Sequence, residues 1–230
     1  MALLKVARLG NPVLTRVAEP VSPEEIAGTE LQRLIEDMVE TMVEERGIGL
    51  AAPQVHRSIR LFVMDAGGDA EAEDVGEEED RDDEDADDDD ADDEEGADDE
   101  DADDDDEDQD EEDAASAASD EGTNVLILVN PVLSFPSERK MRLWEGCLSI
   151  PGLRGPTERF AEVVVDCLDE EGRPQRHLFR GLPAAVAQHE NDHLDGIFFL
   201  QRMPDLARLS FEDELGRHPA SPERRAATST

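Results

Sequence analysis

The stretch LPAAVAQHENDHLDG, residues 182–196, decides the fold of this chain. Its proline suits the first turn of a helix and its final glycine suits the end of one. On a helix, His189 and His193 lie one turn apart on the same face, so both imidazoles can reach one metal ion. Glu190 lies beside them, where its carboxylate can accept a proton from water on that ion. We predict a central helix that carries an HExxH metal site.

A third metal ligand is available from another part of the chain. Cys147 lies in a short turn within residues 145–149, EGCLS. Three protein ligands and one open position are typical of catalytic metal sites, whereas structural sites usually close all four positions. An isolated cysteine is more often a small buried residue, so this prediction depends on the two motifs together.

Hydrolysis of an amide is the reaction that such a site favours. A divalent ion lowers the pKa of its bound water, Glu190 can take up the proton, and the resulting hydroxide can attack a carbonyl carbon. The same carboxyl group can then protonate the leaving amine. The side-chain amide of Gln54 and the backbone N–H of Leu148 are the donors that we expect to stabilise the developing oxyanion.

The charge of the chain is concentrated in one segment. Of the 62 acidic and 21 basic residues, 36 acidic residues and one basic residue lie within residues 69–121. The remaining 177 residues carry 26 acidic and 20 basic side chains, a net charge of −6 that is ordinary for a globular domain. We predict one catalytic domain over residues 1–217, interrupted by a disordered acidic insertion at 69–121 and followed by a flexible tail at 218–230.

The sequence also indicates where the protein works. No apolar run is long enough to cross a bilayer, and the first residues do not resemble a secretory signal, so we expect a cytoplasmic protein. Two cysteines do not suggest a disulfide framework.

The remaining pattern predicts an α+β fold, with mixed or antiparallel sheets packed around the central HExxH helix. Apolar spacing predicts a helix over residues 31–43, with a capping box from Thr29 to Gln32, or an earlier start at Ser22, and an end at Gly47. Strands are expected at residues 60–64 and 125–129, a hairpin at 162–168 and 175–180, and a third helix near 205–215.

Three segments together resemble one known family. They are residues 47–54 (GIGLAAPQ), 145–149 (EGCLS) and 188–193 (QHENDH). In this order they are similar to the signature motifs of the peptide deformylases, and the resemblance extends over residues 2–66 and 123–217. It implies removal of the formyl group from the N-terminal formylmethionine of nascent proteins, with release of formate.

The resemblance also implies roles for particular groups. It implies Fe²⁺ held by Cys147, His189 and His193, with Zn²⁺, Ni²⁺ or Co²⁺ as substitutes. The substrate-binding residues that it implies are Ile48, Gly49, Leu143, Glu145, Arg154, Leu182, Ala185 and Val186. Glu145 is expected to pair with Arg159 behind the methionine pocket, and Ala185 stands where the family usually has a larger aliphatic residue. The implied partners are N-formylmethionyl peptides and, transiently, the ribosome, with no membrane and no direct nucleic-acid contact.

Two other functions remain open from the sequence. A zincin-type endopeptidase shares the helix motif but takes its third ligand downstream, where Asp195 and His218 are the candidates. Alternatively, the acidic segment binds basic partners and provides the main function. A related hypothesis is that the acidic excess suits a high-salt cytoplasm.

Overall fold

The computed structural model describes residues 2–67, 71–73 and 124–217. Its helices are α1 (Pro23–Ile26), α2 (Thr29–Glu44), α3 (Leu182–Leu194) and α4 (Glu212–Arg217), with 3-10 turns η1 (Pro12–Thr15), η2 (Ala52–Val55), η4 (Phe199–Gln201) and η5 (Leu206–Arg208). Its strands are β1 (Gly49–Ala51), β2 (Leu61–Asp65), β3 (Glu71–Glu73), β4 (Val125–Ser134), β5 (Lys140–Cys147), β6 (Ile150–Phe160), β7 (Glu162–Leu168), β8 (Pro174–Arg180) and β9 (Ser210–Phe211). Apart from the short β3, the predicted acidic insertion lies outside the described residues, as does the predicted tail at 218–230.

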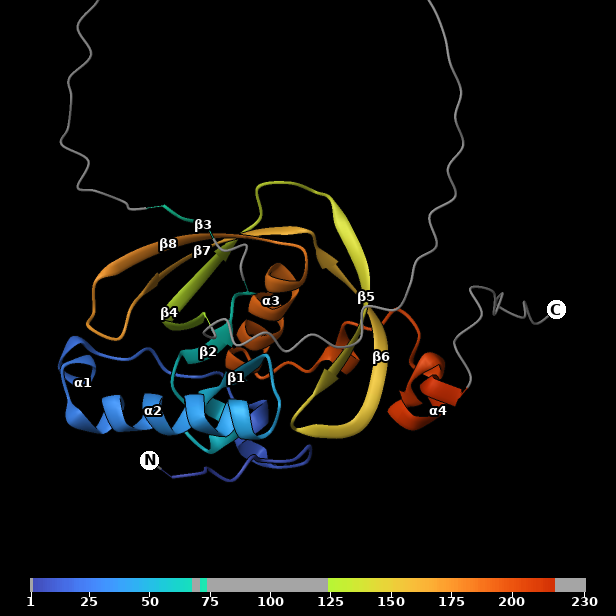
Figure 1. Ribbon diagram of the computed structural model, residues 1–230, viewed down its shortest axis with the longest axis horizontal. Helices are drawn as coiled ribbons and strands as arrows, with labels where there is room; N and C mark the ends of the chain where they lie inside the picture. Colours follow the sequence, from blue (N-terminus) through green and yellow to red (C-terminus); the bar gives the residue numbers. More distant parts are fainter. Residues whose placement is uncertain (1, 68–70, 74–123, 218–230) are drawn as a thin grey trace, which may run out of the picture. The chain divides into compact units, whose positions relative to one another are not determined.

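Helix α3 lies at the centre of the fold, between two antiparallel sheets (Figure 1). In the described part of the chain, one sheet has six strands in the order β1-β2-β4-β7-β8-β3 and the other has three in the order β5-β6-β9. Every strand pair within these sheets is antiparallel. The predicted α+β class with a central HExxH helix is confirmed.

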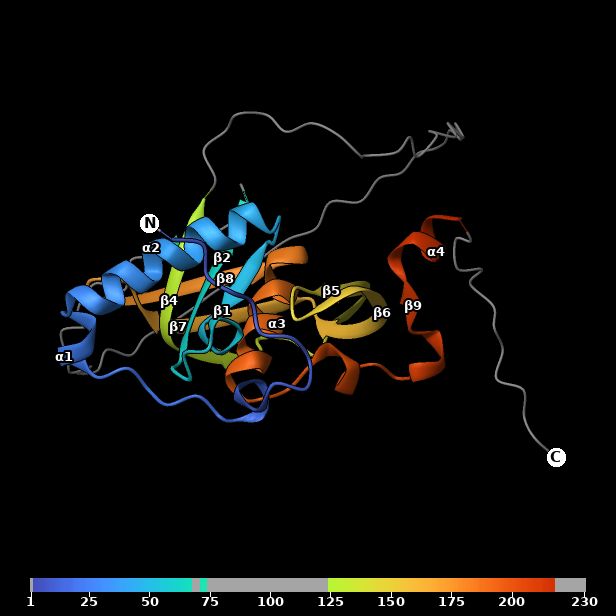
Figure 2. The same cartoon turned by 90° about the horizontal axis from the view of Figure 1, so that it is seen from below.

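The six-stranded sheet is covered by a helix on each face. Strand β2 alternates its side chains between the two faces, as the pleat requires. Phe62 and Met64 belong to the core cluster that contains residues of α3, whereas Leu61 and Val63 belong to the cluster that contains residues of α2. Helix α2 crosses the sheet on the side away from α3 (Figure 2). Strand β2 is therefore almost continuously apolar, because both of its faces are buried.

Helix α3 begins and ends where the sequence predicts. Pro183 lies in its first turn and Gly196 follows it with a φ of 71°, a left-handed conformation that suits glycine. Gln188 fixes the helix to β6, since its side-chain amide donates to the carbonyl of Phe160 at 2.9 Å and accepts from the Phe160 N–H at 3.1 Å. This two-way contact sets the position of α3 relative to β6.

The β5–β6 hairpin was not expected from the sequence. Residues 150–156 contain two prolines and two glycines and lack a period-two pattern, yet β6 pairs with β5 over most of its length. The register shifts between Gly146 and Cys147, and the chain turns at Leu148 and Ser149. Cys147 therefore lies at an irregularity that ends β5, rather than inside the turn, and such irregularities commonly re-aim a side chain.

Two predicted helix signals were wrong. The capping box belongs to α1, where the Ser22 hydroxyl and the Glu25 carboxylate each accept from the other residue's N–H. Helix α2 starts after Gly28 and has no side-chain cap. The earlier start at Ser22 belongs to α1, which is a separate short helix. At the other end Arg46, and not Gly47, takes the left-handed conformation, with a φ of 55°.

Gly47 is needed for a different reason. A Cβ at that position would lie 2.9 Å from Leu148 Cδ1, so the missing side chain lets this loop approach the Cys147 turn closely.

Only part of the third predicted helix is helical in the structure. Residues 206–208 form a 3-10 turn, Ser210 and Phe211 pair with β6, and only Glu212–Arg217 is helical. Pairing with β6 breaks the helical pattern, because it requires extended backbone at Ser210 and Phe211. Among the described residues, none of the helices combines the length and apolar character that a membrane crossing requires.

Candidate metal centre and substrate cleft

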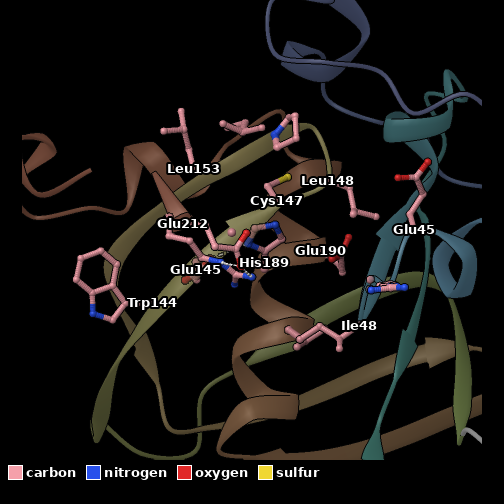
Figure 3. Close-up of a pocket in the computed structure, with 18 of the residues that line it drawn as sticks. Glu45, Ile48, Trp144, Glu145, Cys147, Leu148, Leu153, His189, Glu190 and Glu212 are labelled. Atoms are coloured by element: carbon pink, nitrogen blue, oxygen red, sulfur yellow. Dashed lines mark hydrogen bonds and ion pairs between the residues drawn. The ribbon is translucent and has the colours of Figure 1, made fainter. Parts of the chain in front are cut away.

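Three side chains from distant parts of the chain meet beside α3. One ligand atom each from Cys147, His189 and His193 lies within 4.8 Å of the other two. Cys147 Sγ lies 3.2 Å from His193 Nε2. Figure 3 shows the thiol of Cys147 above the ring of His189, with Glu190 to one side. The predicted three-ligand constellation is present, and its donor set suits iron or zinc.

Glu145 orients the first imidazole. Its Oε2 lies 2.6 Å from His189 Nδ1, so the proton is held on Nδ1 and Nε2 faces the thiol. Burial alone lowers the pKa of His189, but its hydrogen bonds to Cys147 and Glu145 outweigh burial and raise the pKa well above the usual value. The thiol and the carboxylate thus favour a cation here, and a metal ion would displace a proton.

The second imidazole is buried as well. His193 is 1% exposed, and burial, with the neighbouring His189, lowers its pKa well below the usual value. Its Nδ1 is a buried atom without a hydrogen-bond partner among the described residues. A neutral imidazole is the form that coordinates metal, so His193 is prepared for that role.

A buried network of charges supports Glu145 from behind. Arg159 donates from Nε to Glu145 Oε1 at 2.7 Å and from Nη2 to Oε2 at 2.9 Å, and the Thr157 hydroxyl also donates to Oε1. Burial alone raises the pKa of Glu145, but the bonds to His189 and Arg159 hold it far below its usual range. The predicted Glu145–Arg159 pair is therefore present.

The network continues beyond the predicted pair. Arg159 Nη1 lies 2.6 Å from Asp192 Oδ2, and Arg202 donates to both oxygens of Asp192 at 3.0 and 2.6 Å. Asp192 neighbours His193 on α3, so the same network holds both ligand-bearing elements in place. Each buried charge in it is paired, as the cost of burying a charge demands.

Glu190 is buried in an environment that disfavours its ionised form. It is 4% exposed, its Oε2 has no hydrogen-bond partner among the described residues, and burial raises its pKa to about 7. A pKa near the working pH suits a group that takes up a proton and returns it. Gly49 makes room for Glu190, because a Cβ at Gly49 would lie 2.5 Å from Glu190 Oε1.

The two predicted oxyanion donors both lie beside Cys147. The Gln54 side chain is fixed, since its Oε1 accepts from the Ala51 N–H at 2.8 Å. Its Nε2 donates to Ser149 Oγ at 3.2 Å and lies 3.6 Å from Cys147 Sγ. Leu148 follows the thiol directly, and both Gln54 and Leu148 line the cavity beside the metal ligands.

That cavity has a volume of about 750 Å³. Its lining includes every substrate-binding residue predicted from the sequence, namely Ile48, Gly49, Leu143, Glu145, Arg154, Leu182, Ala185 and Val186. Ala185 and Val186 are buried on α3, whereas Ile48 and Leu182 are half exposed at the mouth. The Glu145 carboxylate is occupied by Arg159 and His189, so its contribution to the cleft is indirect.

Sequence reasoning missed Asp192, Thr157 and Glu212. Asp192 requires a cation because it is buried, and that burial follows from the fold and not from the sequence pattern. Thr157 and Glu212 come from strand pairings that no local pattern announced. Of the two downstream candidates for the third ligand of a zincin, Asp195 pairs with Arg60 at 2.8 Å, and the prediction for His218 lies outside the described residues.

Comparison with known proteins gives a consistent result. The sequence model of one family, described as Polypeptide deformylase, matches residues 3–209. A peptide deformylase of Thermus thermophilus is 37% identical over 203 residues, covering 88% of this chain and 83% of that protein. Peptide deformylase 1 of Prochlorococcus marinus (strain MIT 9313) is 31% identical over 215 residues, covering 94% and 88%.

Solved structures agree with the sequence relatives. The Met-Ala-Ser bound class I type b peptide deformylase from Acinetobacter baumannii superposes with a TM-score of 0.62 at 29% identity, covering 88% of this chain and 99% of that one. The peptide deformylase from Thermotoga maritima also gives a TM-score of 0.62, at 25% identity, and covers 89% of this chain and 100% of its own.

Proposed function

This chain belongs to the polypeptide deformylase family, and we propose that it removes the N-formyl group from the formylmethionine of nascent proteins and releases formate. The observation that carries the proposal is the convergence of Cys147, His189 and His193 within 4.8 Å, directly beside the buried carboxyl group of Glu190. A thiolate, two imidazoles and a carboxyl group with a pKa near neutrality are the groups that metal-dependent amide hydrolysis needs.

The metal ion belongs to this proposal. Cys147 Sγ, His189 Nε2 and His193 Nε2 would hold it, and family membership favours Fe²⁺, with Zn²⁺, Ni²⁺ or Co²⁺ as substitutes. The buried negative charge around His189 fits a bound cation. When bound, the ion supplies Lewis-acid polarisation of the formyl carbonyl and lowers the pKa of water. Metal analysis of anaerobically purified protein identifies the ion.

Glu190 is the group that moves the proton. Its carboxylate accepts a proton from the attacking water, and the neutral acid then delivers that proton to the amine nitrogen as the bond to the formyl carbon breaks. Its raised pKa, about 7, allows both steps near neutral pH. Gly49 leaves room for this carboxyl group, because a Cβ there would lie 2.5 Å from Glu190 Oε1.

Gln54 and Leu148 stabilise the charge that develops on the formyl oxygen. The Gln54 amide is oriented before substrate binds, because Ala51 and Ser149 hold its two polar atoms. Preorganised donors of this kind require no rearrangement during the reaction, which is why they lower the barrier. The backbone N–H of Leu148 is the second donor.

The methionine side chain occupies the apolar part of the cavity. Leu143, Leu182, Ala185 and Val186 line it, together with Ile48. The small Ala185 leaves space that a larger residue would fill, so the pocket tolerates side chains bulkier than methionine. The peptide backbone extends along Gly49, and Arg154 contacts the peptide further out.

The acidic segment takes no part in this chemistry. Every residue with a proposed role lies within residues 2–67 or 124–217, which form one catalytic domain. Deletion of residues 69–121 is expected to leave turnover of a short formyl peptide unchanged. Collapse of turnover in a folded deletion variant would instead support a functional role for the segment. Transient contact with the ribosome, where nascent chains emerge, remains part of the proposal and needs a separate binding assay.

Formate release tests the function directly. The protein is expected to release formate from formyl-Met-Ala-Ser and to leave internal peptide bonds intact, since cleavage of an internal bond would indicate an endopeptidase. Cys147→Ser should lose both metal and activity. Cys167→Ser is the matched control, because Cys167 is buried in the core cluster on the six-stranded sheet, away from the metal ligands. Full metal content and activity in Cys147→Ser would overturn the proposed site.

A further inference from the structure

The rim of the cavity carries an ion pair that takes no part in the proposed proton transfer or oxyanion stabilisation. Arg154 from β6 and Glu212 from the start of α4 both line the cavity. Arg154 donates to Glu212 Oε1 from Nη2 at 2.7 Å and from Nε at 3.1 Å. Their side chains are 40% and 58% exposed, so the pair lies at the solvent side of the cleft.

The carboxylate of Glu212 is fixed at this rim by the segment that carries it. Strand β9 pairs with β6 through Leu153 with Phe211 and Arg154 with Ser210, which places Glu212 next to Arg154. The guanidinium of Arg208 lies 5.9 Å from the ring centre of Trp144, another residue that lines the cavity. The C-terminal segment is thus attached to the cleft at several points.

Arg154 in turn lies against the metal-binding strand. A Cβ at Gly146 would lie 3.1 Å from Arg154 Cζ and 3.1 Å from its Nε, so the guanidinium rests on the backbone directly before Cys147. It extends from there to Glu212. The Arg154 guanidinium therefore lies against the residue before Cys147, and its Nε–Nη2 edge is occupied by a carboxylate of the same chain.

The position of this pair relates it to the part of the substrate beyond methionine. Figure 3 shows Glu212 and Trp144 on one side of Cys147 and His189, with Ile48 and Glu45 on the other. The apolar pocket beside Ile48 holds the methionine side chain in the proposed function. In the proposed function the residues that follow methionine leave this pocket toward the solvent side of the cavity, whose lining also includes the charged residues Arg8, Glu45 and Arg46.

We propose that Glu212 is a specificity-determining residue for the side chains that follow methionine. Its carboxylate occupies Arg154 and adds negative charge to the rim, so it disfavours substrates with an acidic side chain there and favours those with a basic one. Without Glu212, Arg154 would attract acidic side chains. This inference rests on the proposed deformylation and adds a substrate preference to it.

The test compares peptides that differ only in charge. Substrates of the form formyl-Met-Xaa-Ser-amide and formyl-Met-Ala-Xaa-amide, with Asp or Lys as Xaa, report on the two positions after methionine. In Glu212→Gln the ratio of kcat/KM for the Asp peptide to that for the Lys peptide should rise by about two- to fivefold at one position or both, the range expected for a solvent-exposed charge pair. Glu212→Lys should raise it further. An unchanged ratio at both positions would overturn the inference.

Asp213→Asn is the matched control. It removes the same charge one residue away, and Asp213 lies 3.7 Å from Arg217 and does not line the cavity. The Asp-to-Lys ratio should stay at the wild-type value in this variant. An equal shift of the ratio in Asp213→Asn would mean that the net charge of the protein sets the ratio, and would overturn the role of Glu212.

Formyl-Met-Ala-Ser-amide separates the two levels of the proposal. If the wild-type protein releases formate from this peptide but the Glu212 variants keep the wild-type selectivity, the proposed function stands. Only the inference about Glu212 is then overturned. A metal-loaded wild-type protein without any formate release would overturn both.

Discussion

His189 Nδ1 lies 2.6 Å from Glu145 Oε2, and this contact joins an imidazole of the proposed metal centre to a buried network of charges. Through Arg159 the network reaches Asp192 on α3, beside His193. The hairpin that supplies Cys147 and the helix that supplies both imidazoles are therefore connected behind the site by buried, paired charges. The relative position of the three ligands depends on this connection.

Glu145→Gln tests the connection. The amide keeps the shape of the side chain but removes the charge that holds the Nδ1 proton and balances Arg159, so we expect metal affinity to fall about 10- to 100-fold. Competition with a chelator measures it. Glu158→Gln is the control, because Glu158 pairs with exposed Arg142 on the same hairpin and its loss should not affect the metal. Equal affinities in wild type and Glu145→Gln would contradict the assignment.

Glu190→Gln should lower turnover by about 100-fold or more, since it removes the proton-transfer group. It should also stabilise the metal-free protein at high pH. The pKa of Glu190 in the folded state, about 7, exceeds the usual value of 4.5, so the folded state binds more protons between these values. Stability from this group is present below pH 4.5 and is lost as pH rises toward 7.

The effect of Glu190→Gln on stability is measured with chelator-treated protein. At pH 8 the variant should exceed wild type by at most about 3 kcal/mol of unfolding free energy, and near pH 4.5 the two should be similar. Denaturant titrations across this range compare them. Parallel curves for the two proteins would show that Glu190 does not titrate as proposed.

Gly49→Ala is expected to displace the proton-transfer group without unfolding the protein. The new Cβ would lie 2.5 Å from Glu190 Oε1 and 2.8 Å from its Cδ, so the carboxyl group must move. Misplacement of a reacting group by about 1 Å can cost about 100-fold in rate. Gly216→Ala, which meets nothing within 4 Å, should leave kcat/KM unchanged. Wild-type activity in Gly49→Ala would show that the close approach is not required.

Asp169 stabilises the β7–β8 hairpin and supplies an acid-sensitive contact. Its Oδ1 accepts from the N–H groups of Glu171 and Arg173 at 2.9 and 2.8 Å, and its Oδ2 accepts from Arg173 Nε at 2.7 Å. Asp169→Ala should cost about 1–3 kcal/mol, because two backbone donors lose their partner. Asp166→Asn, in an exposed pair with Arg176, should cost about 0–1 kcal/mol.

The sign of the pH dependence follows from the same contacts. Burial alone raises the pKa of Asp169, but the hydrogen bonds from Arg173 and Glu171 outweigh it and lower the pKa below the usual value of 3.8. The stabilisation is therefore present above pH 3.8 and is lost as the pH falls below it. The stability difference between wild type and Asp169→Ala should shrink on acidification, and a constant difference would argue against this role.

By itself, the sequence determined the elements whose signals are local. The limits of α3 follow from Pro183 and Gly196, and the shared face of His189 and His193 follows from helix geometry. The buried strand β2 and the β7–β8 hairpin follow from apolar runs and a glycine turn. The convergence of Cys147, His189 and His193 was predictable because the two histidines lie within one helical turn and the cysteine lies in a distinctive motif.

Only the tertiary structure decided how distant segments meet. Strand β6, with its prolines and glycines, becomes extended because β5 and β9 pair with it, and no local pattern encodes that pairing. The same pairing brings Thr157 to Glu145 and Glu212 to Arg154. Contacts of this kind depend on strand register and on the burial of charge, which arise only when the sheets close around α3.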